Sequence, residues 1–187
     1  MKGLLRLRDV TLRRGGNVLF ESLDLELGAG ERLQVTGPNG SGKSSLIRLA
    51  AGLLRAEAGS VERSPLALAD EHVALDRELL LRRALGFWGG AVEQAMVALR
   101  IDHLAEVPVR LLSSGQVKRA TLARVAASNA PLWLLDEPLN ALDTDGRKRL
   151  GALVERHLEA GGAVLAASHQ PLGGDWRELE LGRREAA

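Results

Sequence analysis

The chain has 187 residues, a length that suits one sizeable domain with a hydrophobic core and is short for two. Its 25 Lys and Arg residues nearly balance its 24 Asp and Glu residues, so the total charge gives no indication of a nucleic-acid or membrane-surface binder. The absence of cysteine excludes disulfides and thiolate metal sites, and the apolar runs are far shorter than the roughly 18 to 20 residues of a membrane span.

The N-terminal third alternates between apolar and polar residues. Charges at its start leave no apolar core for a signal peptide, so we expect a soluble, cytoplasmic protein. The alternation that follows predicts strands at residues 5–12, 18–20, 23–27 and 32–36. Apolar residues at helical spacing then predict a helix over residues 43–54.

The middle of the chain, from about residue 74 to 111, changes to charged, Leu- and Ala-rich sequence with a Gly-Phe-Trp-Gly-Gly break at 86–90. We interpret approximately 74–125 as a small helical subdomain inserted into the sheet domain. Ser113 or Ser114 can cap its last helix, which would start near Gly115. The buried side of this helix is predicted to carry Val117, Ala120, Ala123 and Ala126.

The C-terminal third again alternates between strands and a helix. Fully apolar runs at 132–135 and 163–167 predict two buried strands, and a helix is expected after Asp143-Thr144 between them. Such alternation is typical of an α/β fold with a parallel sheet. The charged tail after Gly182 is expected to be loose.

A glycine-rich loop lies between the strand at 32–36 and the helix that follows it. It reads Gly-Pro-Asn-Gly-Ser-Gly-Lys-Ser over residues 37–44, and glycines let backbone N–H groups point at a phosphate. In this pattern the lysine reaches the β- and γ-phosphates and the last serine places its hydroxyl on Mg²⁺. The nucleotide-binding residues predicted here are Gly37, Pro38, Asn39, Gly40, Ser41, Gly42, Lys43, Ser44 and Ser45.

Two carboxylates end the apolar strand at 132–135. Asp136 is predicted to hold Mg²⁺ through water, and Glu137 to polarise the attacking water as general base. An acidic pair after a strand is common, so this interpretation depends on the glycine-rich loop. His169 follows the strand at 163–167, where a parallel sheet binds ligands, and is predicted to contact the γ-phosphate, although a lone histidine is usually incidental.

The segment Leu-Ser-Ser-Gly-Gln at 112–116 stands about 20 residues before the carboxylates. Alone it could be a plain helix cap, but its order between the two nucleotide motifs carries a resemblance over nearly the whole chain. The sequence resembles the ATP-binding subunits of ABC transporters. The strings at 132–143, 168–172 and 85–88, with the short length, make it most similar to the haem exporter ATP-binding subunit of bacterial cytochrome c biogenesis.

This resemblance implies a P-loop NTPase fold of ABC type, with a mostly parallel sheet core, an antiparallel β subdomain and the helical insertion. It implies an ATPase, peripheral at the cytoplasmic face of the inner membrane, that uses ATP and Mg²⁺ and assembles with integral membrane subunits. A second copy joins on ATP binding, and its nucleotide contacts Ser113, Ser114, Gly115 and Gln116, while Asp143 contacts the partner subunit. No nucleic acid is expected, and four scattered histidines without cysteine predict no direct haem site.

The sequence departs from the family pattern at three places. Tyr is absent, and the stretch where the family has an adenine-stacking aromatic reads Leu12-Arg13-Arg14-Gly15. Either an arginine stacks on the base instead, or the adenine is held loosely. The usual glutamine near the Mg²⁺ is missing, and either Glu71 or His72 stands in its place. Ser114 replaces a glycine of the usual pentapeptide, a small change.

Two groups of side chains leave alternatives open. Phe87 and Trp88 lie where the family grips a helix of its membrane partner, but core packing explains them equally well. The basic residues Lys118, Arg119 and Arg124 are predicted to form a solvated helix face.

Three other functions remain possible from the sequence. A transporter for another cargo would share all these motifs, since the membrane subunits select the cargo. A soluble ABC ATPase acting on ribosomes or DNA would usually carry two cassettes or a long arm, and this chain has neither. A small-molecule kinase would leave residues 112–116 unexplained.

Overall fold

Two β-sheets form the framework of the structure, a computed structural model that describes residues 3–70 and 75–182. The larger sheet is parallel, in the order β5-β6-β7-β3-β8, with strands at Leu66–Ala69, Leu132–Asp136, Ala163–Ala167, Arg32–Thr36 and Arg177–Glu180. The smaller sheet is antiparallel, in the order β2-β1-β4, with strands at Asn17–Leu27, Leu5–Arg14 and Ala58–Arg63. The predicted α/β class, with a parallel core and an antiparallel sheet, is confirmed.

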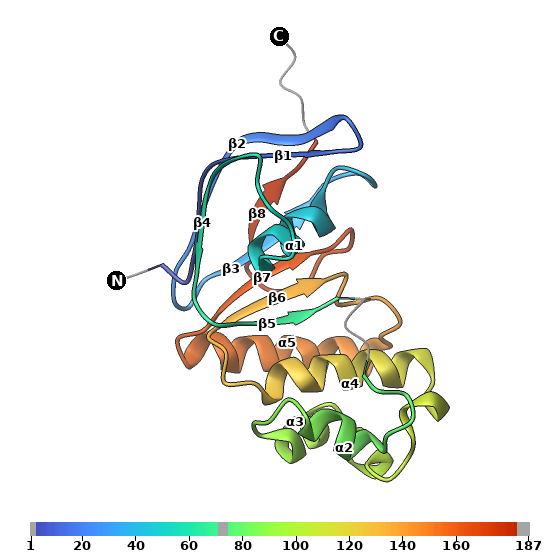
Figure 1. Ribbon diagram of the computed structural model, residues 1–187. Coiled ribbons are helices and arrows are strands. Elements are labelled where there is room, and N and C mark those ends of the chain that lie inside the picture. The colour runs from blue at the N-terminus through green and yellow to red at the C-terminus, as the bar shows by residue number, and fades with distance from the viewer. Residues whose placement is uncertain (1–2, 71–74, 183–187) are drawn as a thin grey trace.

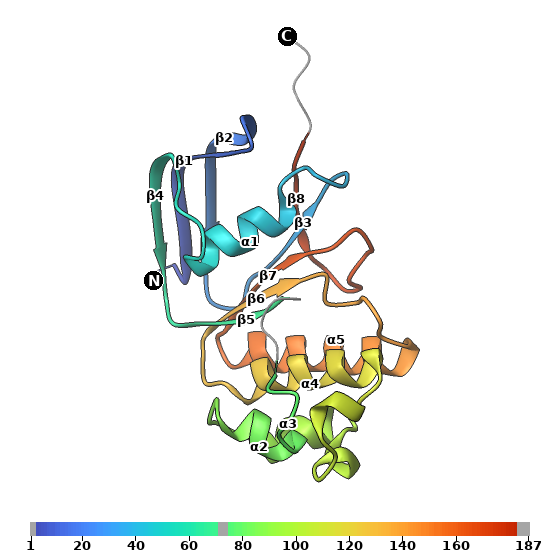
Figure 2. The same ribbon diagram turned by 45° about the vertical axis from the view of Figure 1, so that its right-hand side comes forward.

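Helices cover both faces of the parallel sheet (Figures 1 and 2). α1, Lys43–Ala51, lies between the two sheets, while α4, Ser114–Ala127, and α5, Thr144–Glu159, pack on the opposite face. Beyond α4 lie the short helices and 3₁₀ turns of the middle segment, at Leu81–Gly86 (α2), Val92–Ala98 (α3), Asp102–Leu104 and Val109–Leu111. The helical character predicted for this segment is therefore confirmed, whereas its limits as a subdomain stay a prediction.

The antiparallel sheet differs from the prediction at two strands. β4 was not predicted, because its sequence Ala-Gly-Ser-Val-Glu-Arg lacks apolar alternation and is mostly exposed. The separate strands expected at 18–20 and 23–27 are one continuous strand, β2. The apolar alternation changes phase between Phe20 and Leu23, and the structure absorbs this change in an irregularity of the β1–β2 register. There Ser22 has a φ of 49° and its backbone N–H donates to the Thr11 hydroxyl at 3.2 Å. A bulge keeps pairing continuous across such a slip.

The two central strands, β6 and β7, are buried at every residue, as their apolar runs predict. Successive side chains of β6 point to opposite faces of the sheet. Leu132 and Leu134 join the hydrophobic cluster around α1 and the antiparallel sheet, whereas Trp133 and Leu135 join the cluster under α4 and α5. β6 therefore belongs to both hydrophobic cores.

His157 of α5 stacks on Trp133, with ring centroids 3.9 Å apart and planes 11° apart. Burial lowers the pKa of His157, so the unfolded chain binds a proton here more readily than the folded one. The contribution of neutral, buried His157 to the free energy of unfolding is fully present above the unfolded pKa of about 6.5. It is lost as the pH falls through the lower pKa of the folded state. We expect His157→Phe to reduce the acid sensitivity of the denaturation midpoint below about pH 6.5. Urea unfolding at a series of pH values checks this, and equal slopes for both proteins would contradict it.

None of the helices in the described part of the chain combines the length and apolar character that a membrane span requires. The tail expected to be loose, residues 183–187, lies outside the described residues.

Candidate functional site

The glycine-rich loop joins the carboxyl end of β3 to the first turn of α1, as predicted. Gly37 has a φ of 132°, and a Cβ there would lie 2.3 Å from the carbonyl oxygen of Leu181, so only glycine fits. The Lys43 side chain folds back over the loop, and its Nζ donates to the carbonyl oxygens of Gly37 at 2.8 Å and Pro38 at 3.1 Å. Lys43 as a whole is 7 % exposed, and its ammonium stands among the backbone groups that would surround a phosphate.

A cavity of about 480 Å³ opens beside this loop, a size that suits a small-molecule ligand. Its lining combines the loop and start of α1 with the β1–β2 hairpin and one carboxylate, namely Asn39, Gly40, Gly42, Lys43, Ser44, Ser45, Arg14, Gly15, Leu19 and Glu137. Residues 12–15, where the family pattern has an adenine-stacking aromatic, contain two arginines. Arg13 pairs with Glu57 at 3.0 Å, while Arg14 lines the cavity. Arg14, with its planar guanidinium, is therefore the side chain placed to lie against a base.

Asp136 stands at the end of β6, opposite the first turn of α1. The Ser44 hydroxyl donates to Asp136 Oδ1 at 3.0 Å, so the structure brings together the two predicted metal ligands. Asp136 is 5 % exposed, and burial raises the pKa of its carboxyl, an effect that the Ser44 hydrogen bond opposes and the charge of Glu137 reinforces. A hydroxyl and a carboxylate are hard oxygen donors of the kind that Mg²⁺ prefers. The donor set fits this ion.

The raised pKa of Asp136 has a consequence for stability. A carboxyl whose folded pKa lies above its unfolded value stabilises the fold at low pH and ceases to do so as the pH rises through the folded pKa. At pH 7.5 the ionised, buried carboxylate therefore costs free energy, which Asp136→Asn removes while retaining an acceptor for Ser44. We expect the variant, without ligands, to melt a few degrees higher than the wild type, since about 1 kcal/mol shifts Tm by roughly 2–4 °C in a domain of this size.

Thermal melts without ligands measure the stability of each protein, and melts with ATP and Mg²⁺ measure how much the ligands raise its melting temperature. The variant should gain none of the additional stabilisation that the ligands give the wild type. A lower melting temperature for the unliganded variant would contradict the expected cost of the buried charge.

Glu137 and His169 meet at the same edge of the sheet, at 2.8 Å between Oε2 and Nδ1. Glu137 has a φ of 45°, a left-handed conformation rare outside glycine, and its backbone N–H donates to the carbonyl oxygen of Ala167 at 2.8 Å. The other ring nitrogen of His169 lies 3.2 Å from the Gln170 amide nitrogen. Because a carboxylate only accepts and an amide nitrogen only donates, this arrangement places the ring proton on Nδ1.

The loop that carries His169 is held by a residue that the sequence analysis did not single out. Gln34 lies buried on β3, and its Nε2 donates to the carbonyl oxygen of Gln170 at 2.8 Å. Its Oε1 accepts from the backbone N–H of Leu172 at 3.4 Å. The signal in the sequence is a glutamine inside the buried part of a strand, where a polar side chain needs partners.

The segment at 112–116 forms the start of α4. Of the two predicted caps it is Ser113 that acts, since its Oγ accepts from the Gln116 N–H at 3.3 Å and its N–H donates to the Gln116 side chain at 2.8 Å. Ser113, Gly115, Gln116 and Asp143 line a second cavity, of about 270 Å³. None of the residues that line this cavity lines the cavity beside the glycine-rich loop.

Asp143 connects this second cavity to α5. It caps α5 by accepting from the Gly146 N–H at 2.8 Å, and it pairs with Arg119 at 2.6 Å. These hydrogen bonds, first that of Gly146 and then that of Arg119, hold the pKa of Asp143 below its usual value. The predicted cap is therefore present, and the same side chain remains at the cavity surface, with its carboxylate ionised.

The prediction of a solvated basic face on α4 is wrong. Lys118 donates to the carbonyl oxygen of Asp136 at 3.4 Å, and Arg119 bridges Asp143 and Asp145. Arg124 is 7 % exposed and donates to the carbonyl oxygen of Leu68. The reason is that α4 is covered by the sheet, by α5 and by α3, so its long basic side chains must find acceptors inside. Of the apolar positions predicted to be buried, Ala120 and Ala123 are so, while Val117 and Ala126 are half-buried.

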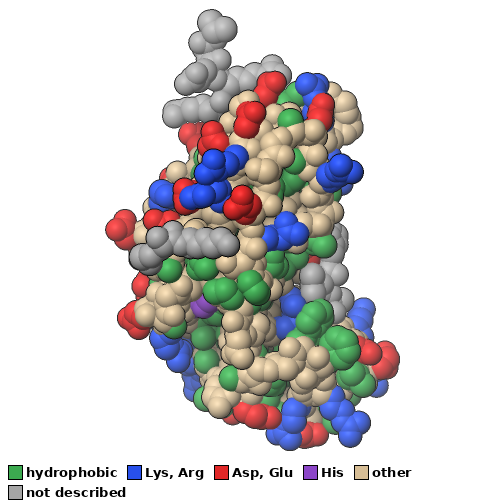
Figure 3. Space-filling model, turned by 60° about the vertical axis from the view of Figure 1, so that its left-hand side comes forward, with side chains coloured by type: hydrophobic (Ala, Val, Ile, Leu, Met, Phe, Trp, Pro, Cys, Tyr) green, Lys and Arg blue, Asp and Glu red, His purple; other side chains and the backbone are tan. Residues whose placement is uncertain are grey.

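Phe87 and Trp88 are not core residues. Phe87 is 82 % exposed and Trp88 48 % exposed, and their rings meet edge to face with centroids 5.5 Å apart. Figure 3 shows hydrophobic side chains at the surface toward the lower end of the molecule, the end at which α2 and α3 lie. Exposed aromatic surface of this kind is typical of a site of contact with another protein.

Glu71 and His72, the two candidates for the missing glutamine, lie outside the described residues. The residue before them, Asp70, is 5 % exposed and pairs with Arg48 of α1 at 3.5 Å.

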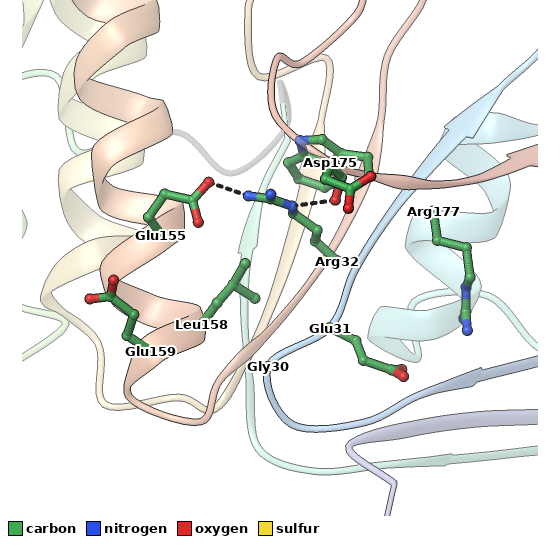
Figure 4. Close-up of a pocket in the computed structure, with 9 residues that line it drawn as sticks. Gly30, Glu31, Arg32, Glu155, Leu158, Glu159, Asp175 and Arg177 are labelled. Carbon is green, nitrogen blue, oxygen red and sulfur yellow. Dashed lines mark hydrogen bonds and ion pairs between the residues drawn. The ribbon is translucent and has the colours of Figure 1, made fainter.

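A further hollow, of about 630 Å³, lies at the amino ends of β3 and β8, away from the glycine-rich loop (Figure 4). Its central side chain, Arg32, pairs with Glu155, donates to the backbone of Asp175 and lies 5.7 Å from the Trp176 ring centroid. Arg32 thus connects β3 to α5 and to the segment before β8, which is consistent with a structural role for this hollow. Across the described residues no group of three or more His, Cys, Asp or Glu side chains is arranged to hold a metal ion.

Comparisons with known proteins identify the family and the fold. The family model for ABC transporters matches residues 20–140. The cytochrome c biogenesis ATP-binding export protein CcmA of Sphingopyxis alaskensis is 52 % identical, with 97 % of this chain and 98 % of that protein covered. The protein of the same name in Novosphingobium aromaticivorans is 54 % identical over 88 % of this chain and 87 % of its own length. A solved ATP-binding subunit of an ABC transporter shares the fold, with a TM-score of 0.81 at 21 % identity, covering 89 % of this chain and 79 % of that one.

Proposed function

Because the chain belongs to the ABC transporter family and is an ATP-hydrolysing subunit, we propose that it energises haem export in cytochrome c maturation. The support for this cargo is the name that its full-length relatives carry. In this proposal residues 1–187 act as one ATPase domain, with the helical insertion at approximately 74–125. The protein works at the cytoplasmic face of the inner membrane, bound to integral membrane subunits.

The observation that carries the mechanism is the separation of the two cavities. Within one copy, the segment at 112–116 and Asp143 line a different cavity from the glycine-rich loop. A nucleotide can contact both only when a second copy brings its own α4 to the loop of the first. We therefore place each ATP between the glycine-rich loop of one copy and Ser113, Ser114, Gly115 and Gln116 of the other.

The chemistry in this closed pair follows from the groups around the loop. Lys43 binds the β- and γ-phosphates, while Ser44 directly and Asp136 through water would hold Mg²⁺, which supplies charge neutralisation of the phosphates. Glu137 accepts a proton from the attacking water. His169 fixes the orientation of the Glu137 carboxylate and reaches the γ-phosphate. Hydrolysis removes the ligand that joins the two copies, so they separate.

The membrane partner is proposed to dock on Phe87 and Trp88, whose exposure leaves them available. The chain carries no group of side chains suited to haem in its sequence, so cargo recognition is assigned to the membrane subunits. A transporter for another cargo is the second candidate, because the same ATPase site serves any cargo.

The test is a pulldown from solubilised membranes with Glu137→Gln in the presence of ATP. We expect membrane subunits of cytochrome c maturation to co-purify, and to be lost when Lys43 is also changed to Ala. Recovery of other transporter subunits would replace the cargo and keep the ATPase. Recovery of ribosomes or DNA would overturn the transport function.

A further inference from the structure

We propose that Arg124 is a positioning residue that ties Trp88 on the partner-docking surface to strand β5 beside the nucleotide site, so that ATP binding changes the environment of Trp88. The inference rests on the proposed function, since it gives that site a connection to the surface where the partner docks. Arg124 is a buried cation that the proposed catalytic chemistry leaves unused.

Arg124 is a buried charge held at a cost. It is 7 % exposed, and its Nε has no hydrogen-bond partner in the structure. Burial lowers the pKa of its guanidinium, an effect that the charge of Asp70 opposes. A buried guanidinium that leaves one donor unpaired adds little to stability, because desolvation offsets its contacts. Its geometry therefore calls for an explanation other than stability.

On one side Arg124 contacts the strand that leads to the nucleotide site. Its Nη2 donates to the carbonyl oxygen of Leu68 in β5. Two residues further on, Asp70 pairs with Arg48 of α1, the helix that begins with Lys43 and Ser44. The charges of Arg48 and Asp70 both act on the pKa of Asp136, in opposite directions, which places them within electrostatic reach of the metal carboxylate.

On the other side Arg124 contacts the exposed aromatic pair. Its guanidinium carbon lies 4.6 Å from the centroid of the Trp88 ring, a cation–π distance. The turn after Trp88 is fixed to the end of α4, because the Ala91 N–H donates to the Ala127 carbonyl oxygen at 3.0 Å. A Cβ at Gly90 would lie 1.8 Å from that same oxygen, so only glycine allows this approach. Trp88 is thus attached to the helix whose other end carries Ser113.

The contact with Leu68 ties Arg124 to the sheet, and the contact with Trp88 ties it to the turn that follows α2. The Arg124 guanidinium therefore connects two layers of the fold. If ATP moves β5 relative to α4, one of the two contacts must change. A hydrogen bond from a charged donor is stronger than a cation–π contact with a half-exposed ring, so the contact with Trp88 is the one that yields. The indole of Trp88 then reports what happens at Asp70 and Asp136.

The test follows Trp88 fluorescence in the full chain carrying Glu137→Gln, which keeps ATP bound. Subtracting the spectrum of the same chain with Trp88→Phe isolates this indole from Trp133 and Trp176. On addition of ATP and Mg²⁺ we expect the Trp88 emission to shift by several nanometres and its quenching by acrylamide to change about twofold, as for a side chain that loses a stacked cation. Arg124→Met should abolish this response, while the affinity for a fluorescent ATP analogue stays within about threefold, because Arg124 is not among the residues that line the nucleotide cavity.

Arg83→Met is the matched control, because Arg83 is an exposed arginine of α2 near the same turn, and it should leave the response intact. A response unchanged in Arg124→Met would overturn the proposal. So would the absence of any Trp88 response in the chain with Arg124 intact, whatever the folding of the variant. Failure to bind the ATP analogue at all would instead contradict the proposed function.

Discussion

Replacing Glu137 by Gln should slow ATP hydrolysis by roughly 10²- to 10⁴-fold, the usual contribution of a general base, while ATP still binds. The carboxylate lies at the edge of the nucleotide cavity and is oriented by His169 at 2.8 Å. Glutamine keeps the shape of the side chain and removes its basicity. Because Lys43 and Ser44 are untouched, the phosphates keep their contacts. ATP should therefore accumulate with two copies of the chain closed around it.

Phosphate release measures the loss of turnover, and size-exclusion chromatography with ATP and Mg²⁺ measures the closed pair. Glu159→Gln, an exposed glutamate at the end of α5, is the control and should behave as the wild type. A variant that hydrolyses ATP within about tenfold of the wild type would exclude Glu137 as the base. A variant that neither hydrolyses nor pairs would point to a fault in nucleotide binding instead.

Mixing two variants that are each inactive, Lys43→Ala and Ser114→Asp, should restore ATP hydrolysis. Lys43→Ala removes the ammonium that meets the phosphates. Ser114→Asp places a carboxylate in the first turn of α4, a position that the helix dipole tolerates. In the closed pair this carboxylate would face and repel the γ-phosphate of the ATP bound to the loop of the second copy. Each variant alone should hydrolyse ATP at less than about 1 % of the wild-type rate. In a pair formed from one of each, one site has an intact loop and an intact α4.

An equimolar mixture should regain roughly a quarter of the wild-type rate, since half of the pairs are mixed and each has one of two sites intact. The rate should rise with the square of protein concentration when pairing limits it. Mixing Lys43→Ala with itself or with Glu137→Gln supplies the controls, as neither combination assembles a complete site. If Ser114→Asp alone retained activity, the nucleotide would not lie between two copies.

Local patterns predicted most of the elements that build the site. The buried strands β6 and β7, the cap of α4 and the glycine-rich loop each depend on nearest neighbours in the sequence, and the structure has them where expected. The ends of the elements were predicted less accurately. α1 stops at Ala51 and not at Leu54, because Gly52 adopts a left-handed φ of 79° that ends the helix. The strand β8 was not predicted, because its sequence Arg-Glu-Leu-Glu is polar and mostly exposed at a sheet edge.

The side-chain contacts of α4 show where sequence reasoning ends. Lys118 and Arg124 look like solvent-facing residues because charge usually marks a surface. Their actual partners are carbonyl oxygens of Asp136 and Leu68, which come from strands distant in the chain. Nothing local in the sequence encodes such a pairing. The residues of the glycine-rich loop could be predicted because they belong to a motif, whereas Leu19, which lines the same cavity, and Gln34 and Arg124 have roles that depend on tertiary contacts.

The double membership of β6 has a consequence for how the molecule unfolds. Leu132 and Leu134 support one hydrophobic cluster and Trp133 and Leu135 the other, on the same five-residue strand. Loss of either cluster exposes a face of β6, so neither half can melt while the other stays intact. The β6 amides should accordingly exchange with solvent deuterium only through global opening. Asp136 and Glu137, the proposed Mg²⁺ residue and general base at the end of this strand, therefore sit on the part of the chain that is last to open.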